Sequence, residues 1–218
     1  MGMRKKDKAM TVTAIVLAVI TIALLVPFIY VSKYAYPWAD DFSYGTDARM
    51  VYLSTHSVLK TIGEAIRSTA AVYKEWQGTY TSCFLMALQP AVWNIRLYHL
   101  TGMIMTFSML GAYIALGLVV FKRLWKMSFP GAVSIALLAY LISAERVIGI
   151  AEAFTWFNGA VHYTYMNSLM VFFVSMVALY VFGKSGDERK PVAKIVLTVL
   201  LCLLGVIAAG SNNVTALT

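Results

Sequence analysis

Five long apolar runs limit what this 218-residue chain can fold into. Each is at least 19 residues long and nearly free of charge, and a helix of about 20 residues crosses the hydrocarbon core of a bilayer. The runs are residues 10–32, 99–121, 129–148, 163–183 and 192–210. Charged residues make up only 13% of the chain, too few to cover a water-soluble globule. We therefore predict an all-α fold, an integral membrane helical bundle with five transmembrane helices.

Lysine and arginine are concentrated in alternate connections between these runs. If the N-terminus is cytoplasmic, the inner segments 1–9, 122–128 and 184–194 contain eleven, and the longer outer segments 33–98 and 149–162 contain six. Cytoplasmic loops of membrane proteins retain an excess of cations. This pattern predicts a cytoplasmic N-terminus and an extracytoplasmic C-terminal end. The net charge of +8 is then explained by topology, and we expect no nucleic-acid partner.

The outer segment 33–98 is too long for a plain loop. Apolar residues recur at helical spacing between residues 58 and 84, with charged residues between them, which predicts an amphipathic helix on the outer leaflet. The apolar stretch 82–93 is too short for a span, and we expect it at the outer surface. The whole chain, 1–218, is thus expected to form a single transmembrane domain with one extracytoplasmic helical segment.

Two adjacent carboxylates, Asp40 and Asp41, follow the outer end of the first span among aromatic residues. Such a pair can supply a general base, or hold a divalent cation against a phosphate. A solvated turn in which one Asp caps the next helix explains the same residues. Both interpretations stay open.

A second cluster lies in the outer loop that precedes residue 163. It contains Glu152, Trp156, Asn158 and His162. Flat aromatic rings beside an amide and a carboxylate suit a sugar pocket, whereas an interfacial aromatic belt explains the rings equally well. A third cluster, residues 210–215, includes Asn212 and is either a glycosylation acceptor or, more simply, a helix C-cap. The three histidines have no metal-ligand spacing, so we predict no metal site.

Four short stretches resemble a family of uncharacterised bacterial multi-pass membrane proteins, whose organisation is similar to that of the GT-C membrane glycosyltransferases. The stretches are residues 40–44, 76–80, 156–163 and 210–212. The resemblance implies a multi-pass protein of the bacterial cytoplasmic membrane. It also implies an inverting enzyme that transfers a sugar from a polyprenyl-phosphate donor to a cell-surface glycan or lipid acceptor.

The same resemblance implies roles for individual residues. Asp40 or Asp41 would be the catalytic base, and the helix of residues 58–84 would form one wall of the site. The partners would be membrane lipid, the lipid-linked sugar donor and the acceptor, with no cofactor other than a possible divalent cation. The implied substrate-binding residues are Trp76, Gln77, Tyr80, Arg96, Glu152, Trp156, Asn158, His162 and Asn212. Members of that group are longer, so we expect an N-terminal fragment that lacks part of the donor-binding cavity.

A non-enzymatic membrane protein is the alternative, either one half of a transporter or an assembly subunit for surface polysaccharide. A transporter should place ionisable or helix-breaking residues at mid-membrane. In this chain the middles of the spans are apolar, with Pro27 and Asn167 towards the outer ends. The pattern therefore favours chemistry at the membrane surface over transport.

Overall fold

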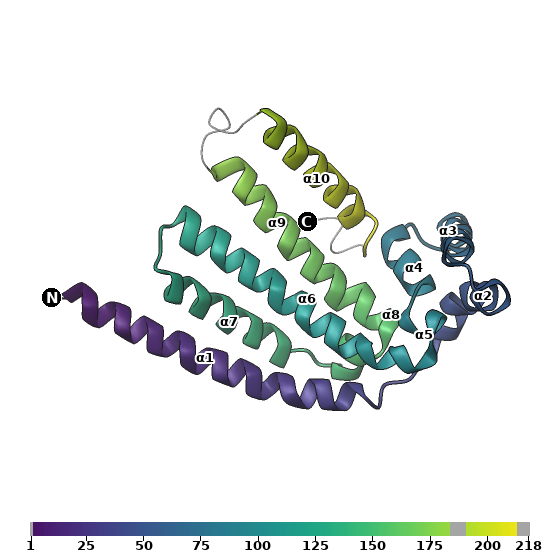
Figure 1. Cartoon of the computed structure of the whole chain (residues 1–218), viewed down its shortest axis with the longest axis horizontal. Helices are drawn as coiled ribbons and strands as arrows, with labels where there is room; N and C mark the ends of the chain where they lie inside the picture. The colour runs from purple at the N-terminus through teal and green to yellow at the C-terminus, as the bar shows by residue number, and fades with distance from the viewer. Residues whose placement is uncertain (1, 184–190, 213–218) are drawn as a thin grey trace. The chain divides into compact units, whose positions relative to one another are not determined.

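Helices account for every regular element in the described part of the chain. The computed structural model describes residues 2–183 and 191–212 (Figure 1). It contains α-helices joined by short 3-10 and π-helical turns, and no strand occurs in these residues. The predicted all-α class is confirmed.

Four helical stretches of the described residues are long and apolar enough to cross a membrane. They are Asp7–Ser32, Ile95–Leu124, Phe157–Phe182 and Pro191–Ala209. The elements concerned are α1 (Gly2–Ser32), η1 (Ile95–His99), α6 (Leu100–Leu116), η2 (Gly117–Leu124), α8 (Phe157–Ala160), η4 (Val161–Tyr165), α9 (Met166–Phe182) and α10 (Pro191–Ala209). The remaining predicted span corresponds to α7 (Phe129–Glu145), which has 17 residues and is shorter than these four. The chain is therefore a membrane-embedded helical protein.

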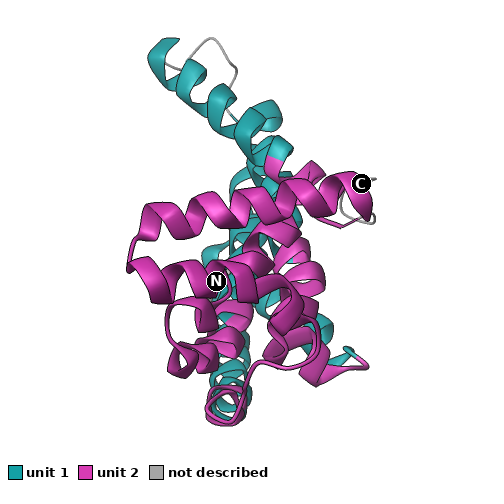
Figure 2. Ribbon diagram, turned by 90° about the vertical axis from the view of Figure 1, so that its right-hand side faces the viewer, with its two compact units in different colours: residues 1–27, 107–147, 168–206 teal, residues 28–106, 148–167, 207–218 magenta. Residues whose placement is uncertain are grey.

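The chain forms two compact units, coloured separately in Figure 2. Unit 1 consists of residues 1–27, 107–147 and 168–206, and unit 2 of residues 28–106, 148–167 and 207–218. Several long helices begin in one unit and end in the other. Unit 2 contains all three clusters of candidate site residues.

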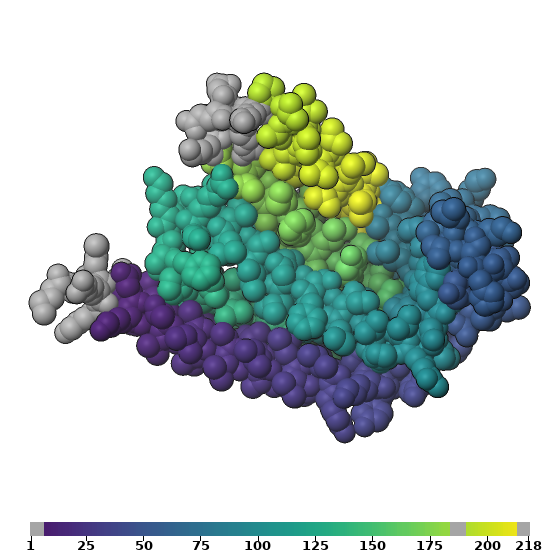
Figure 3. Space-filling view, in the orientation of Figure 1, coloured from purple at the N-terminus to yellow at the C-terminus, as the bar shows by residue number. Residues whose placement is uncertain are grey.

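Unit 1 exposes apolar side chains along its helices. On α1, Val12, Val19 and Ile22 are each about 60% exposed, and Figure 3 shows this helix in purple. Apolar side chains presented so continuously need lipid as their solvent. Between helices the packing is close. A Cβ on Gly117 would lie 2.6 Å from the Cβ of Ala136, so only glycine allows η2 this approach to α7.

Unit 2 is built around four short helices: α2 (Asp40–Thr55), α3 (Val58–Glu75), α4 (Tyr80–Ala87) and α5 (Pro90–Trp93). The Ser57 hydroxyl caps α3 by accepting a hydrogen bond from the Lys60 N–H at 3.4 Å. The predicted helix of residues 58–84 is interrupted, because α3 ends at Glu75 and α4 starts only at Tyr80. The stretch 82–93 forms parts of α4 and α5, both far too short to span a bilayer.

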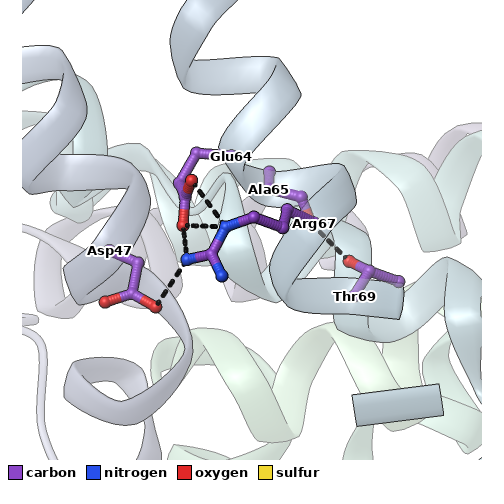
Figure 4. A network of polar contacts seen from close by, with 5 residues as sticks. All are labelled: Asp47, Glu64, Ala65, Arg67 and Thr69. Atoms are coloured by element: carbon purple, nitrogen blue, oxygen red, sulfur yellow. Dashed lines mark hydrogen bonds and ion pairs between the residues drawn. The ribbon is translucent and has the colours of Figure 1, made fainter. Parts of the chain in front are cut away.

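An arginine joins α2 and α3 at the surface of unit 2 (Figure 4). The Arg67 guanidinium pairs with Glu64 through both carboxylate oxygens and lies 4.0 Å from Asp47 of α2. This hydrogen bond lowers the pKa of Glu64. Arg67 and Asp47 are exposed, and ion pairs at the surface add little stability, so the two helices depend mainly on their buried residues. Among these, Ala48 of α2 and Ala65 of α3 are almost completely buried.

Candidate functional site

The two neighbouring aspartates begin α2 and have different surroundings. Successive helical residues point about 100° apart, and here Asp41 is buried at 2% exposure whereas Asp40 is exposed. Both carboxylates lie in the first helical turn, where the helix dipole favours negative charge. Ala39, just before them, has φ 49° and ψ −125°, a backbone conformation that residues with a Cβ rarely adopt.

Asp41 ties three segments of unit 2 together. Its Oδ1 accepts a hydrogen bond from the Asn158 N–H at 3.2 Å, and its Oδ2 accepts one from the Trp38 N–H at 3.2 Å and another from the Tyr98 hydroxyl. Burial raises the pKa of Asp41, although these three donors oppose the shift. With both oxygens engaged, Asp41 is placed to hold the segments and not to meet a substrate.

Tyr98 and Gln89 also hydrogen-bond to Asp41, and the three residues together form a buried anchor. The fully buried Tyr98 hydroxyl also accepts a hydrogen bond from the Phe157 N–H at 2.8 Å. The buried Gln89 amide donates to the backbone oxygen of Asp41 and packs against Gly45, where a Cβ would overlap it. Neither residue was predicted from the sequence. A polar Gln within the apolar stretch 82–93 was the available signal, because a buried amide needs partners.

A cavity of about 590 Å³ opens beside this anchor, entirely within unit 2. Aromatic rings contribute to its wall, and Tyr44 accepts a hydrogen bond from the Gln77 amide at 3.0 Å. Trp76, which is 82% exposed, lies in the gap between α3 and α4. Six predicted site residues line the cavity: Asp40, Trp76, Gln77, Trp156, Asn158 and His162. The break in the predicted surface helix thus supplies two of the lining residues.

Two lining residues carry buried polar atoms that lack hydrogen-bond partners in the described part of the chain. They are the Nε1 of Trp156 and both the Oδ1 and the Nδ2 of Asn158. Asn158 is only 3% exposed. Each such atom costs about 1 to 3 kcal/mol if it stays unpaired, so native proteins pair nearly all of them. Trp156 and Asn158 both line the cavity, so a molecule bound there is a candidate partner for these three buried atoms.

The ionisable groups of the cavity are few. Asp40 is the only carboxylate among its described lining residues, His162 is the only imidazole, and none of them is Lys or Arg. The described residues also contain no group of three or more His, Cys, Asp or Glu that could hold a metal ion. A molecule in the cavity would meet one negative charge, one imidazole and several neutral polar groups.

Four predicted substrate-binding residues do not line the cavity: Tyr80, Arg96, Glu152 and Asn212. The Asn212 amide donates to the backbone oxygen of His162, and the Tyr80 ring packs against Gly210. The Arg96 side chain is exposed on η1, and Glu152 is exposed in η3 (Ala151–Thr155) next to Gly149. Asn212 therefore holds the backbone of the lining residue His162, and Tyr80 packs against the segment that carries Asn212.

Comparisons with protein-family models, curated proteins and solved structures found no match to this chain. The chemistry of the cavity is therefore inferred from its own residues.

Proposed function

We propose that the chain crosses the membrane five times, with a cytoplasmic N-terminus and unit 2 at the extracytoplasmic face. The uneven distribution of Lys and Arg supports this orientation. α7 would be the fifth span, since 17 helical residues measure about 25 Å at 1.5 Å each. Glu145 and Arg146 at its end would reach the headgroups, which shortens the apolar length required.

The amphipathic α3 would then lie along the outer leaflet. Leu59, Ile66 and Tyr73 are exposed apolar residues of this helix, whereas Thr61 and Ala65 are buried against the rest of unit 2. Lipid would cover the exposed apolar residues, as it covers other interfacial helices. The cavity would consequently open at headgroup depth, within reach of a lipid-linked substrate.

For the cavity itself we propose a GT-C type glycosyltransferase site in the bacterial cytoplasmic membrane, which moves a sugar from a polyprenyl-phosphate donor to a glycan or lipid acceptor. One observation carries this proposal: an exposed carboxylate, Asp40, shares an aromatic-walled cavity with the unpaired polar atoms of Trp156 and Asn158. Sugar hydroxyls both donate and accept hydrogen bonds, and aromatic rings cover the apolar face of a pyranose.

Asp40 would act as the general base. The acceptor hydroxyl gives its proton to the Asp40 carboxylate while its oxygen forms a bond to the anomeric carbon. The bond from that carbon to the phosphate oxygen breaks, the phosphate leaves with the electron pair, and the anomeric configuration inverts. A divalent cation in the cavity would have Asp40 as its one carboxylate ligand among the described lining residues.

The test measures transfer of radiolabelled sugar from a polyprenyl phosphate in membranes that contain the protein. Asp40→Asn should lower the initial rate by about a hundredfold or more, as expected when a general base is lost. Asp47→Asn is the matched control, because Asp47 lies on the same helix but does not line this cavity. Undiminished transfer by Asp40→Asn would contradict the catalytic assignment, and binding without transfer by the wild type would identify a carrier or assembly subunit instead.

A further inference from the structure

His162 contacts Ser82 of α4 through the Nδ1 side of its ring. It lies in η4, lines the cavity, and has its Nδ1 3.1 Å from the Ser82 Oγ. Either atom can be the donor in this pair, depending on which ring nitrogen carries the proton. The surroundings of Ser82 decide between the two possibilities.

Ser82 is completely buried, and its one hydroxyl proton can be donated to a backbone carbonyl oxygen instead of to His162. The Oγ lies 3.1 Å from the backbone oxygen of Thr79 and 3.2 Å from that of Ser211. The oxygen of Thr79 already accepts the Cys83 N–H at 3.1 Å, whereas in the described part of the chain Ser82 is the partner that reaches the oxygen of Ser211. Carbonyl oxygens only accept, so a proton given to His162 would leave a buried acceptor unpaired.

The Ser82 hydroxyl therefore donates its proton to a backbone carbonyl oxygen, and its own oxygen accepts a hydrogen bond from His162. The Nδ1 of His162 must then carry the proton and donate it to Ser82. A neutral imidazole has one protonated nitrogen, so its Nε2 has a free lone pair. Because Nδ1 donates to the buried Ser82, Nε2 is the ring nitrogen that a molecule in the cavity can bind, and Nε2 accepts hydrogen bonds.

Backbone contacts fix both partners in place without any ligand. The oxygen of Gly210 accepts the Thr81 N–H at 2.7 Å, which anchors the first turn of α4 beside Ser82. Two residues later, the Asn212 amide donates to the backbone oxygen of His162. The segment 210–212 thus holds the serine and the histidine at a set separation, as a preorganised binding group requires.

We propose that Ser82 is a positioning residue that holds His162 in its Nδ1–H form, and that the His162 Nε2 accepts a hydrogen bond from a sugar hydroxyl. Naming a sugar as the ligand rests on the function proposed above. The cavity would then match a pair of neighbouring hydroxyls, with one donating to His162 and the other accepting from the Asn158 or Trp156 N–H.

Two substitutions at His162 separate the roles of the ring nitrogens. In His162→Asn the side-chain amide occupies the place of Nδ1 and can still donate to Ser82, but nothing replaces Nε2. In His162→Gln the longer side chain brings an amide to the place of Nε2. Binding of a radiolabelled hexosyl polyprenyl phosphate to the detergent-solubilised full chain should weaken about tenfold in His162→Asn and less than about threefold in His162→Gln.

The control and the positioning residue complete this experiment. His56→Asn should bind like the wild type, because His56 follows α2 and does not line the cavity. Ser82→Ala should weaken binding about threefold or more, since the freed ring can adopt the other tautomer. Equal losses in His162→Asn and His162→Gln, or unchanged binding in Ser82→Ala, would overturn the proposal.

A measurement without ligand separates this inference from the proposed function. Nitrogen NMR of histidine-labelled protein distinguishes protonated from bare ring nitrogens, and the His162 signals are those that disappear in His162→Asn. We expect a protonated Nδ1 and a bare Nε2 in the wild type, and a mixture in Ser82→Ala. A protonated Nε2 in the neutral wild-type ring would overturn the assignment. If the expected form is found but no hexosyl lipid binds, the proposed function fails while the acceptor role of Nε2 stands.

Discussion

The Tyr98 hydroxyl donates a hydrogen bond to the Asp41 carboxylate at a place where neither side chain reaches solvent. The same hydroxyl accepts the Phe157 N–H, so one oxygen links η1, α2 and α8. Because Phe157 and Asn158 are neighbours, this link also sets the position of the cavity wall. The first two predictions concern this pair.

Tyr98→Phe should destabilise the protein without changing its volume appreciably. The substitution leaves the Phe157 N–H without its buried partner and removes one of the three donors to the Asp41 carboxylate, which costs on the order of 2 to 4 kcal/mol in total. Denaturant unfolding in detergent, followed by tryptophan fluorescence, measures the change. Tyr73→Phe removes an exposed hydroxyl and should be nearly neutral. Similar small effects of both substitutions would contradict the anchoring role of Tyr98.

Asp41 should make stability depend on pH. Burial raises its pKa above the ordinary value of 3.8, so the folded protein holds this proton more tightly than the unfolded chain does. The contribution of Asp41 to stability is then fully present below pH 3.8 and is lost as the pH rises through the raised pKa. The unfolding temperature of the wild type, relative to that of Asp41→Asn, should accordingly decrease from acid to neutral pH. An increase over that range would show that the pKa is lowered instead.

Gly210→Ala should disturb the packing behind the cavity. A Cβ at this position would overlap the Tyr80 ring, whose own helix carries Ser82. We expect a loss of about 1 to 3 kcal/mol in the free energy of unfolding, typical of overpacking. Gly63→Ala is the control, because no atom lies within 4 Å of its added Cβ. In the middle of α3 that change should stabilise by about 0.5 to 1 kcal/mol. Equal effects at the two glycines would contradict the close packing at Gly210.

Asn158→Leu should separate stability from binding. The substitution replaces a buried amide with two unpaired polar atoms by an apolar side chain of similar size. We expect unfolding stability to stay the same or increase by up to about 2 kcal/mol, while binding of the hexosyl lipid is lost. Asn212→Leu is the contrasting variant, since it removes the hydrogen bond to the His162 backbone and should lower stability. A marked loss of stability in Asn158→Leu would mean that its amide has a structural partner.

The long apolar helices could be predicted from the sequence because hydropathy and length alone define them. α6, α9 and α10 lie within the predicted runs to within one residue, and α1 ends where predicted but begins at Gly2, before the predicted start at residue 10. The break between α3 and α4 was missed because apolar residues continue at helical spacing through residues 76–79. Gly78 was the local signal of a helix end in that stretch.

The different roles of Asp40 and Asp41 could not be predicted from the sequence, in which the two residues are equivalent neighbours. Their separation depends on the start of α2 and on Tyr98 and Asn158, which are 57 and 117 residues away from Asp41 along the chain. The meeting of Ser82 and His162 is a contact of the same kind, across 80 residues. Sequence patterns describe faces of single helices, whereas these pairs arise from tertiary packing.

The glycosylation acceptor considered as an alternative to a helix C-cap would be residues 213–215, which lie outside the described residues. Its neighbours 210–212 are described and hold α4 and His162 by backbone and amide hydrogen bonds. The contacts with α4 join late residues of the chain to residues made more than a hundred positions earlier. During synthesis, residues 210–212 must therefore leave the ribosome before these hydrogen bonds can form. A chain that ended after α9 would contain every lining residue of the cavity but would lack the segment whose hydrogen bonds hold α4 and His162.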